Sequence, residues 1–164
     1  MFREMRRKRQ LLPVEESRAI LTRRTAGVLA VAGDDGYPYA VPISYVYAGG
    51  KIYLHSARSG HKLDGILRDS RVSFCVIDQD MIVPQEFTTY FRSVILFGRA
   101  RILEDEAERW RALEQLGAKY SPGYAAGCQK EIAGQIKNTC LIEITIEHMT
   151  GKEAIELVRS RKQG

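Results

Sequence analysis

The sequence has no apolar run approaching the roughly 18 residues that a membrane-spanning helix requires. Charged residues interrupt every hydrophobic segment, and the opening Met1-Phe2-Arg3-Glu4 is not part of an apolar signal core. These absences argue against a membrane protein and against export through a signal peptide. The 164 residues suit one domain, so we expect a single domain over 1–164, with a basic N-terminal arm at 1–12.

Cysteine is scarce, and the spacing of Cys75, Cys128 and Cys140 does not resemble that of a metal site. Cys75 and Cys140 lie in apolar, strand-like runs, which favours reduced thiols in the core. The sequence contains neither a zinc signature such as HExxH nor a readable serine–histidine–acid order. We therefore expect no metal and a cytoplasmic protein.

Acidic residues are outnumbered by basic ones, which gives a formal net charge of +5. Five of the basic residues lie within the first ten positions. Neither a recognition helix nor a zinc finger nor an RNA-binding strand motif follows them. We interpret the arm as solvated or covering a neighbouring subunit, and expect no nucleic-acid partner.

Strand-like patterns dominate the remaining sequence, with helical patterns between them. The strands are expected at 27–33, 37–47, 51–56, 71–78, 88–105 and 140–151, with a bend near Gly98. The first three are expected to form an antiparallel meander, and 79–87 a loop. Helices are expected at 14–24, 62–69, 106–119 and near 129–136. Six mostly antiparallel strands with flanking helices predict a mainly β fold, a small closed barrel.

The segment SARSGHK at 56–62 follows a predicted strand and opens a predicted helix. Unpaired N–H groups and the helix dipole attract anions at such a junction. Arg58 can clamp phosphate oxygens in bidentate fashion, and Lys62 offers a point charge. An ordinary polar turn with solvated cations explains the pattern equally well.

Two prolines, Pro38 and Pro42, interrupt the strand-like run 37–47. Proline donates no ladder hydrogen bond, so an interruption at Pro42 leaves backbone groups around Val41 to Ser44 free for a planar heterocycle. A simple edge strand is the alternative. His55, just before the polar turn, could donate a proton to a bound molecule, although an isolated histidine is more often structural.

Taken together, these segments resemble the nitroimidazole-resistance flavoproteins of the pyridoxamine 5′-phosphate oxidase-like superfamily. The resemblance rests on segments in the order LAVAGDDGYPYAVPISYVY at 29–47, IYLHSARSGHKLDGI at 52–66, VSFCVI at 72–77 and SVILFGRARIL at 93–103. It implies a six-stranded antiparallel split barrel that forms a homodimer, with flavin mononucleotide (FMN) between the subunits.

The resemblance also assigns roles to individual residues. It implies phosphate binding by Ser56, Arg58, His61 and Lys62, and ring contacts from the backbone of Val41, Pro42, Ile43 and Ser44. It implies that Tyr90, Arg92 and Ser93 of the partner chain close the site, with His55 as proton donor. The chain ends LVRSRKQG and has its only tryptophan at Trp110, unlike the substrate-gripping segment of true pyridoxamine phosphate oxidases, which argues against vitamin B6 oxidation.

Two functions remain open at this point. The first is an oxidoreductase that passes electrons from reduced flavin to a small acceptor such as a nitroaromatic. The alternative is a non-catalytic flavin- or haem-binding module for storage, sensing or transfer, in which His148 or His55 would be the haem ligand.

Overall fold

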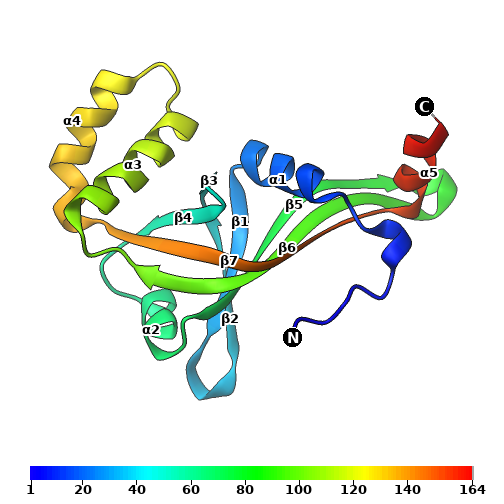
Figure 1. Cartoon of the computed structure of the whole chain (residues 1–164), viewed down its shortest axis with the longest axis horizontal. Coiled ribbons are helices and arrows are strands. Elements are labelled where there is room, and N and C mark those ends of the chain that lie inside the picture. Colours follow the sequence, from blue (N-terminus) through cyan, green and yellow to red (C-terminus); the bar gives the residue numbers. More distant parts are fainter. Residues whose placement is uncertain (164) are drawn as a thin grey trace.

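The computed structural model describes residues 1–163, with side chains to residue 161, and within that range five α-helices flank one seven-stranded antiparallel sheet (Figure 1). The strand order is β2-β1-β5-β6-β7-β4-β3. The strands are β1 (Ala26–Ala32), β2 (Pro38–Ser44), β3 (Val46–Ala48), β4 (Lys51–Ser56), β5 (Arg71–Val83), β6 (Thr88–Ile102) and β7 (Cys140–Glu153). The helices are α1 (Val14–Arg23), α2 (His61–Arg68), α3 (Glu106–Tyr120), α4 (Ala125–Gln135) and α5 (Ile155–Gln163).

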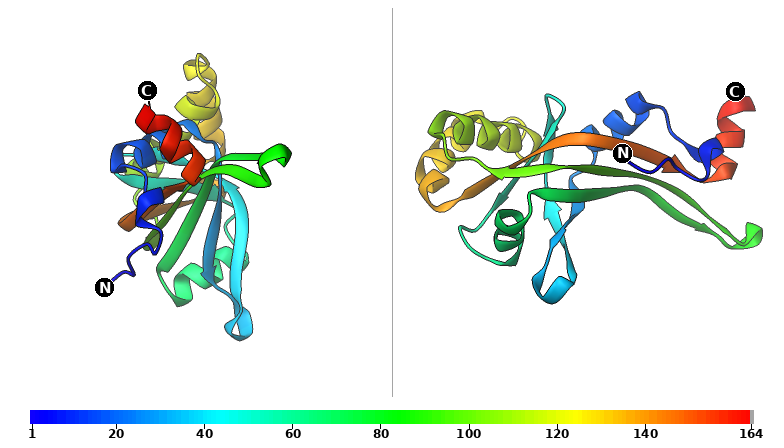
Figure 2. Two further views of the ribbon diagram at one scale, coloured as in Figure 1. Left: turned by 90° about the vertical axis from the view of Figure 1, so that its right-hand side faces the viewer. Right: turned by 60° about the horizontal axis from the view of Figure 1, so that its bottom comes forward.

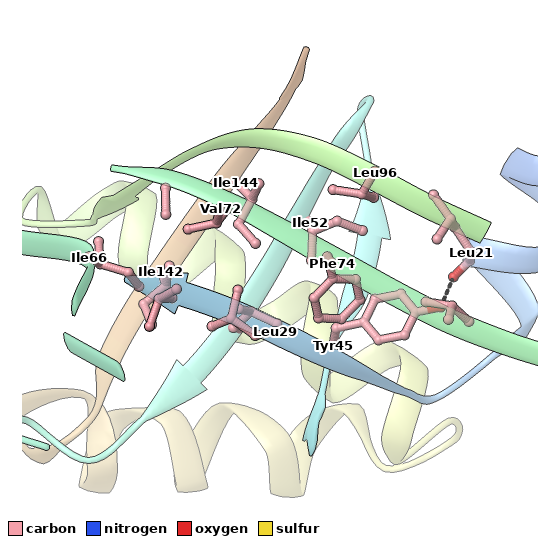
Figure 3. Close-up of a cluster of buried hydrophobic side chains, with 14 of the residues drawn as sticks. Leu21, Leu29, Tyr45, Ile52, Ile66, Val72, Phe74, Leu96, Ile142 and Ile144 are labelled. Atoms are coloured by element: carbon pink, nitrogen blue, oxygen red, sulfur yellow. Dashed lines mark hydrogen bonds between the residues drawn. The ribbon is translucent and has the colours of Figure 1, made fainter. Parts of the chain in front are cut away.

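The predicted mainly β, antiparallel fold is confirmed, and its core lies against the inner face of the sheet. Apolar side chains of β1, β4, β5, β6 and β7 alternate inward, and α1 and α2 cover the cluster. Figure 3 shows this core, which includes Leu29, Ile52, Phe74, Leu96 and Ile142.

The expected strand at 37–47 is divided into β2 and β3 at Tyr45. The Tyr45 side chain is fully buried, and its hydroxyl donates to the carbonyl of Leu21 at 2.9 Å (Figure 3). Its backbone N–H is shared between the hydroxyl of Tyr120 at 2.8 Å and the carbonyl of Thr25 at 3.3 Å. The sequence-based count of six strands was therefore one too low.

Two further expectations about the sheet were wrong. The three-stranded meander is absent, since β2 pairs with β1 whereas β4 pairs with β3 and β7. The barrel is also not closed by hydrogen bonds, because β2 and β3 are the two edges of the described sheet. The turn at Tyr45 causes both differences by sending consecutive strands to opposite edges.

The loop expected at 79–87 is largely strand. A register shift between Ile77 and Gln79 lets β5 continue to Val83, paired with the start of β6. The hairpin projects away from the rest of the sheet (Figures 1 and 2). Because neither of its faces covers the core, its sequence lacks the alternation of apolar and polar residues by which a strand is predicted. The irregularity expected near Gly98 is present as a register shift against β7.

Candidate functional site

The turn between β4 and α2 has the features of an anion-binding site. Gly60 precedes α2 with φ of 131°, a conformation that side chains disfavour, and no side chain caps the helix. The amides of Leu63 and Asp64 donate to the Gly60 carbonyl. The earlier amides of α2 have no acceptor within the helix, so they remain available to an anion.

Two predicted side chains, Ser56 and Lys62, meet at this turn. The Lys62 ammonium donates to Ser56 Oγ at 3.1 Å, and Ser56 is only 9% exposed. Residues six apart in sequence are thus joined across the turn, and the ammonium keeps two further donors.

His61 is the first residue of α2. Its ring packs against neighbouring side chains, and one of its ring nitrogens lacks a hydrogen-bond partner. Its ring stacks on Tyr39 of β2, with centroids 4.0 Å apart. Its Nε2 atom is buried without a hydrogen-bond partner, since Asp34 Oδ2 lies 3.6 Å away. The Arg68 hydrogen bond, followed by the charge of His61, lowers the pKa of Asp34. An orphaned polar atom beside free helix amides fits an anionic ligand.

Arg58 is exposed and reaches the opposite side of the turn. Its Nη1 atom donates to the backbone carbonyl of Lys137 at 3.1 Å. The remaining guanidinium nitrogens make no hydrogen bond within the described residues, so Arg58 can contribute to anion binding at the rim.

The interruption expected at Pro42 is absent, since β2 runs unbroken from Pro38 to Ser44 as an edge strand, which was the alternative. Gly33 N–H donates to the Tyr37 carbonyl, and Tyr45 N–H to the Thr25 carbonyl. Pairs alternate along an antiparallel ladder, so Val41 and Ile43 direct their backbone groups to β1. The Pro42 carbonyl and the Ser44 N–H and carbonyl therefore face the unpaired edge. The Tyr39–His61 stack brings this strand beside the anion-binding turn.

His55 lies on the other face of β4 from Ser56. Burial alternates along the strand, with Leu54 and Ser56 buried and His55 exposed. His55 instead lines a cavity of about 620 Å³ beneath α3 and α4. The structure thus does not direct His55 into the Ser56–Lys62 cluster.

The three residues expected from a partner chain lie far from the turn within this chain. Tyr90, Arg92 and Ser93 belong to the part of β6 in the projecting hairpin, whereas α2 lies at the other end of the sheet (Figures 1 and 2). Tyr90 donates to Glu86 at 2.8 Å, and Ser93 pairs with Lys152 of β7. Arg92 donates to buried Glu153 at 3.0 Å, so its guanidinium already forms an ion pair within its own chain.

Sequence reasoning missed Tyr39 and Tyr120 as parts of this region. Tyr39 belongs to a tyrosine-rich stretch whose usual explanation is cross-strand packing. Tyr120 comes from a helix 75 residues away from its partner, Tyr45, and no local pattern marks such a contact.

Within residues 1–163, no group of three or more histidine, cysteine or acidic side chains is placed to hold a metal. No helix in that range has the length and apolarity to span a bilayer.

The fold and site together define an antiparallel split barrel in which the uncapped start of α2 lies beside an open strand edge. A sequence profile described as pyridoxamine 5′-phosphate oxidase matches residues 13–153. The match covers most of the chain, which therefore belongs to that family. An uncharacterised protein of Rhizobium meliloti (strain 1021) is 26% identical over 149 residues, 85% of this chain and 91% of that protein.

Solved structures share the fold. A Bacteroides thetaiotaomicron protein, proposed to confer 5-nitroimidazole antibiotic resistance, superposes with a TM-score of 0.72 at 22% identity. The superposition covers 87% of this chain and 86% of that one. A FAD-binding protein from Mesorhizobium loti gives a TM-score of 0.62 at 26% identity, over 88% and 97% of the two chains. The profile match thus confirms the predicted membership of the pyridoxamine 5′-phosphate oxidase family, and the solved structures confirm the fold.

Proposed function

We propose that this chain is an FMN-binding flavoprotein that passes electrons from reduced flavin to a small acceptor such as a nitroaromatic. The observation that carries the proposal is the cluster of Ser56, His61 and Lys62 at the uncapped start of α2, beside the free edge of β2. A flavin supplies the redox chemistry, whereas the protein binds and orients it.

The described residues fit the two ends of the cofactor. Lys62, the Nε2 atom of His61 and the first amides of α2 would hold a phosphate, with Arg58 at the rim. On the β2 edge, the Pro42 carbonyl would accept from the N–H of a planar imide, and the Ser44 N–H would donate to an imide carbonyl. One compact group of donors suits a single phosphate, which favours FMN over the FAD of the Mesorhizobium loti protein.

We further propose a homodimer in the cytoplasm. The support for a dimer is an apolar stretch on the outer face of β5 and β6, where Ile77, Ile95 and Phe97 are 60%, 42% and 40% exposed. The projecting β5–β6 hairpin would bring Tyr90, Arg92 and Ser93 to the partner's flavin. The cytoplasmic location rests on the cysteine usage of the sequence.

Flavin titration of Lys62→Met tests the site. Removing a charge-assisted contact is expected to weaken FMN binding by about 10- to 100-fold. Lys130→Met is the matched control, because Lys130 is an exposed lysine of α4 outside the cluster. Equal affinities for the two variants would contradict the placement of the phosphate.

Rapid-mixing absorbance tests the redox function. The chain is loaded with FMN, reduced without oxygen and mixed with a nitroaromatic. Faster reoxidation than in buffer supports electron transfer, and His55→Gln is expected to slow it if the imidazole supplies the proton. If the nitroaromatic does not accelerate reoxidation of the bound flavin, the result would favour the non-catalytic alternative.

A further inference from the structure

The cavity that His55 lines is roofed by the α3–α4 helical hairpin and is separate from the Ser56–Lys62 cluster. It measures about 620 Å³, within the usual range for small-molecule sites. Figure 1 shows α3 and α4 side by side at the end of the sheet. The walls are largely apolar and aromatic, formed by Leu113, Leu116, Tyr120, Tyr124 and Ile132.

The charge around the cavity restricts what can enter it. Glu131 is the lining residue with a fixed charge, and that charge is negative. Lys119 and Arg109 are not lining residues: Lys119 donates to the Arg24 carbonyl, and Arg109 donates to the carbonyls of Ile136 and Thr139. The cavity therefore disfavours anions such as carboxylates.

The cavity residues that neighbour the proposed flavin site along the chain face away from it. His55 lines the cavity and lies on the other face of β4 from Ser56. Tyr120, which also lines it, accepts a hydrogen bond from the N–H of Tyr45, which points toward Thr25 and away from the free edge at Ser44. A molecule in this cavity would thus bind apart from the flavin.

We propose that this cavity binds a small aromatic molecule that is neutral or cationic, at a site separate from the proposed flavin site. Binding there can be measured without flavin. The apolar walls supply the affinity, and Glu131 supplies discrimination by charge.

A cavity-filling pair of variants tests the location. Gly127 lines the cavity, and a Cβ built there meets no atom within 4 Å, so Gly127→Leu adds a side chain into open space. Gly134 of the same helix is equally uncrowded but lies outside the lining, so Gly134→Leu is the matched control. Leucine has a higher helix propensity than glycine, so both substitutions are compatible with α4.

Calorimetric titration with 1-naphthylmethylamine, 1-naphthylmethanol and 1-naphthoate tests the chemistry. The amine and the alcohol are expected to bind. The amine is expected to bind at least about fivefold more tightly than naphthoate. Gly127→Leu is expected to weaken both by about tenfold or more, unlike Gly134→Leu. Glu131→Gln is expected to reduce the preference for the amine, whereas Glu106→Gln, an exposed change on α3, retains it.

The outcomes separate this proposal from the flavin proposal. Naphthyl binding that survives Gly127→Leu, or tighter binding of naphthoate than of the amine, overturns the cavity assignment. Loss of FMN binding in Gly127→Leu also overturns it, because the cavity would then belong to the cofactor. If the chain takes up no FMN, the flavin function fails, while naphthyl binding blocked by Gly127→Leu still supports the cavity.

Discussion

At the residue scale, Asp78 of β5 ties together elements that are distant in sequence. It is 8% exposed and accepts from Arg23 at 2.6 Å and from Arg24 at 2.7 Å. Burial acts most strongly and would raise the pKa of Asp78, but the bonds and charges of both arginines outweigh it and lower the pKa. A carboxylate with a lowered pKa stabilises the folded chain in its charged form.

Asp78→Asn is therefore expected to lower the free energy of unfolding by about 2 kcal/mol at pH 7, since the arginines are half-exposed. The ionic contribution is complete above the unfolded pKa near 3.8 and is lost as the pH falls through the lowered folded value. Urea unfolding at pH 7 and pH 3 should show the wild-type advantage shrinking with acid. Asp80→Asn, an exposed neighbour, is the control; an undiminished advantage at pH 3 would contradict the linkage.

The site residues that lie close in sequence could be predicted from it. Ser56, His61 and Lys62 flank one turn, so a strand followed by a helix already brings them together. The direction of His55 could not be foreseen, because it depends on where α3 and α4 cover the outer face of β4. The contribution of Tyr90, Arg92 and Ser93 to a partner's site stays a prediction.

At the element scale, the end of α3 is fixed to the point where β2 gives way to β3. Tyr120 accepts from the Tyr45 N–H and donates to a carbonyl of Thr25 or Tyr45. Lys119 lies 4.3 Å above the Tyr45 ring and donates to the Arg24 carbonyl; burial lowers the pKa of this lysine. These contacts hold the end of α3 against Tyr45 and the residues that join α1 to β1.

Tyr120→Phe is expected to cost about 1 kcal/mol of unfolding free energy, because the partly exposed hydroxyl joins several backbone groups. Thermal or urea unfolding measures the change. Tyr124→Phe serves as control, since that side chain is 73% exposed and its hydroxyl makes no hydrogen bond in the described chain. Similar losses in both variants would argue against this role for Tyr120.

Element positions were predictable where the hydrophobic period is regular, as in β1, β7 and α3. The division at Tyr45 was not predictable. A tyrosine within a run of strand-forming residues indicates one more strand residue unless its burial against Leu21 is known. The extension of β5 to Val83 was hidden for the opposite reason: an exposed hairpin shows no apolar alternation.

At the scale of the whole molecule, the exposed apolar face of β5 and β6 is the proposed dimer interface. The N-terminal arm crosses its margin, where Phe2 stacks on His148 and Phe97 with centroids 4.8 Å and 5.6 Å apart. This contact lies within the arm's own chain, so the covering of a neighbouring subunit stays a prediction. Ile77 and Ile95 remain exposed beside it.

Ile95→Glu is expected to convert a dimer into monomers, because a charge at a buried apolar interface loses its hydration. Sedimentation velocity of the purified chain measures this. Val14→Glu on α1, another exposed apolar position, should leave the dimer intact. A wild-type monomer, or an Ile95→Glu dimer, would contradict the proposed interface.

The central claim is that the chain holds a flavin at the turn between β4 and α2. The most direct test is the visible spectrum of the chain purified without added cofactor, with the released chromophore identified by mass and the same measurement made on the double variant Arg58→Ala, Lys62→Ala. We expect flavin absorption bands and the mass of FMN for the wild-type chain, and loss of both in the double variant. A haem spectrum, or a colourless protein that takes up no added flavin, would contradict the claim.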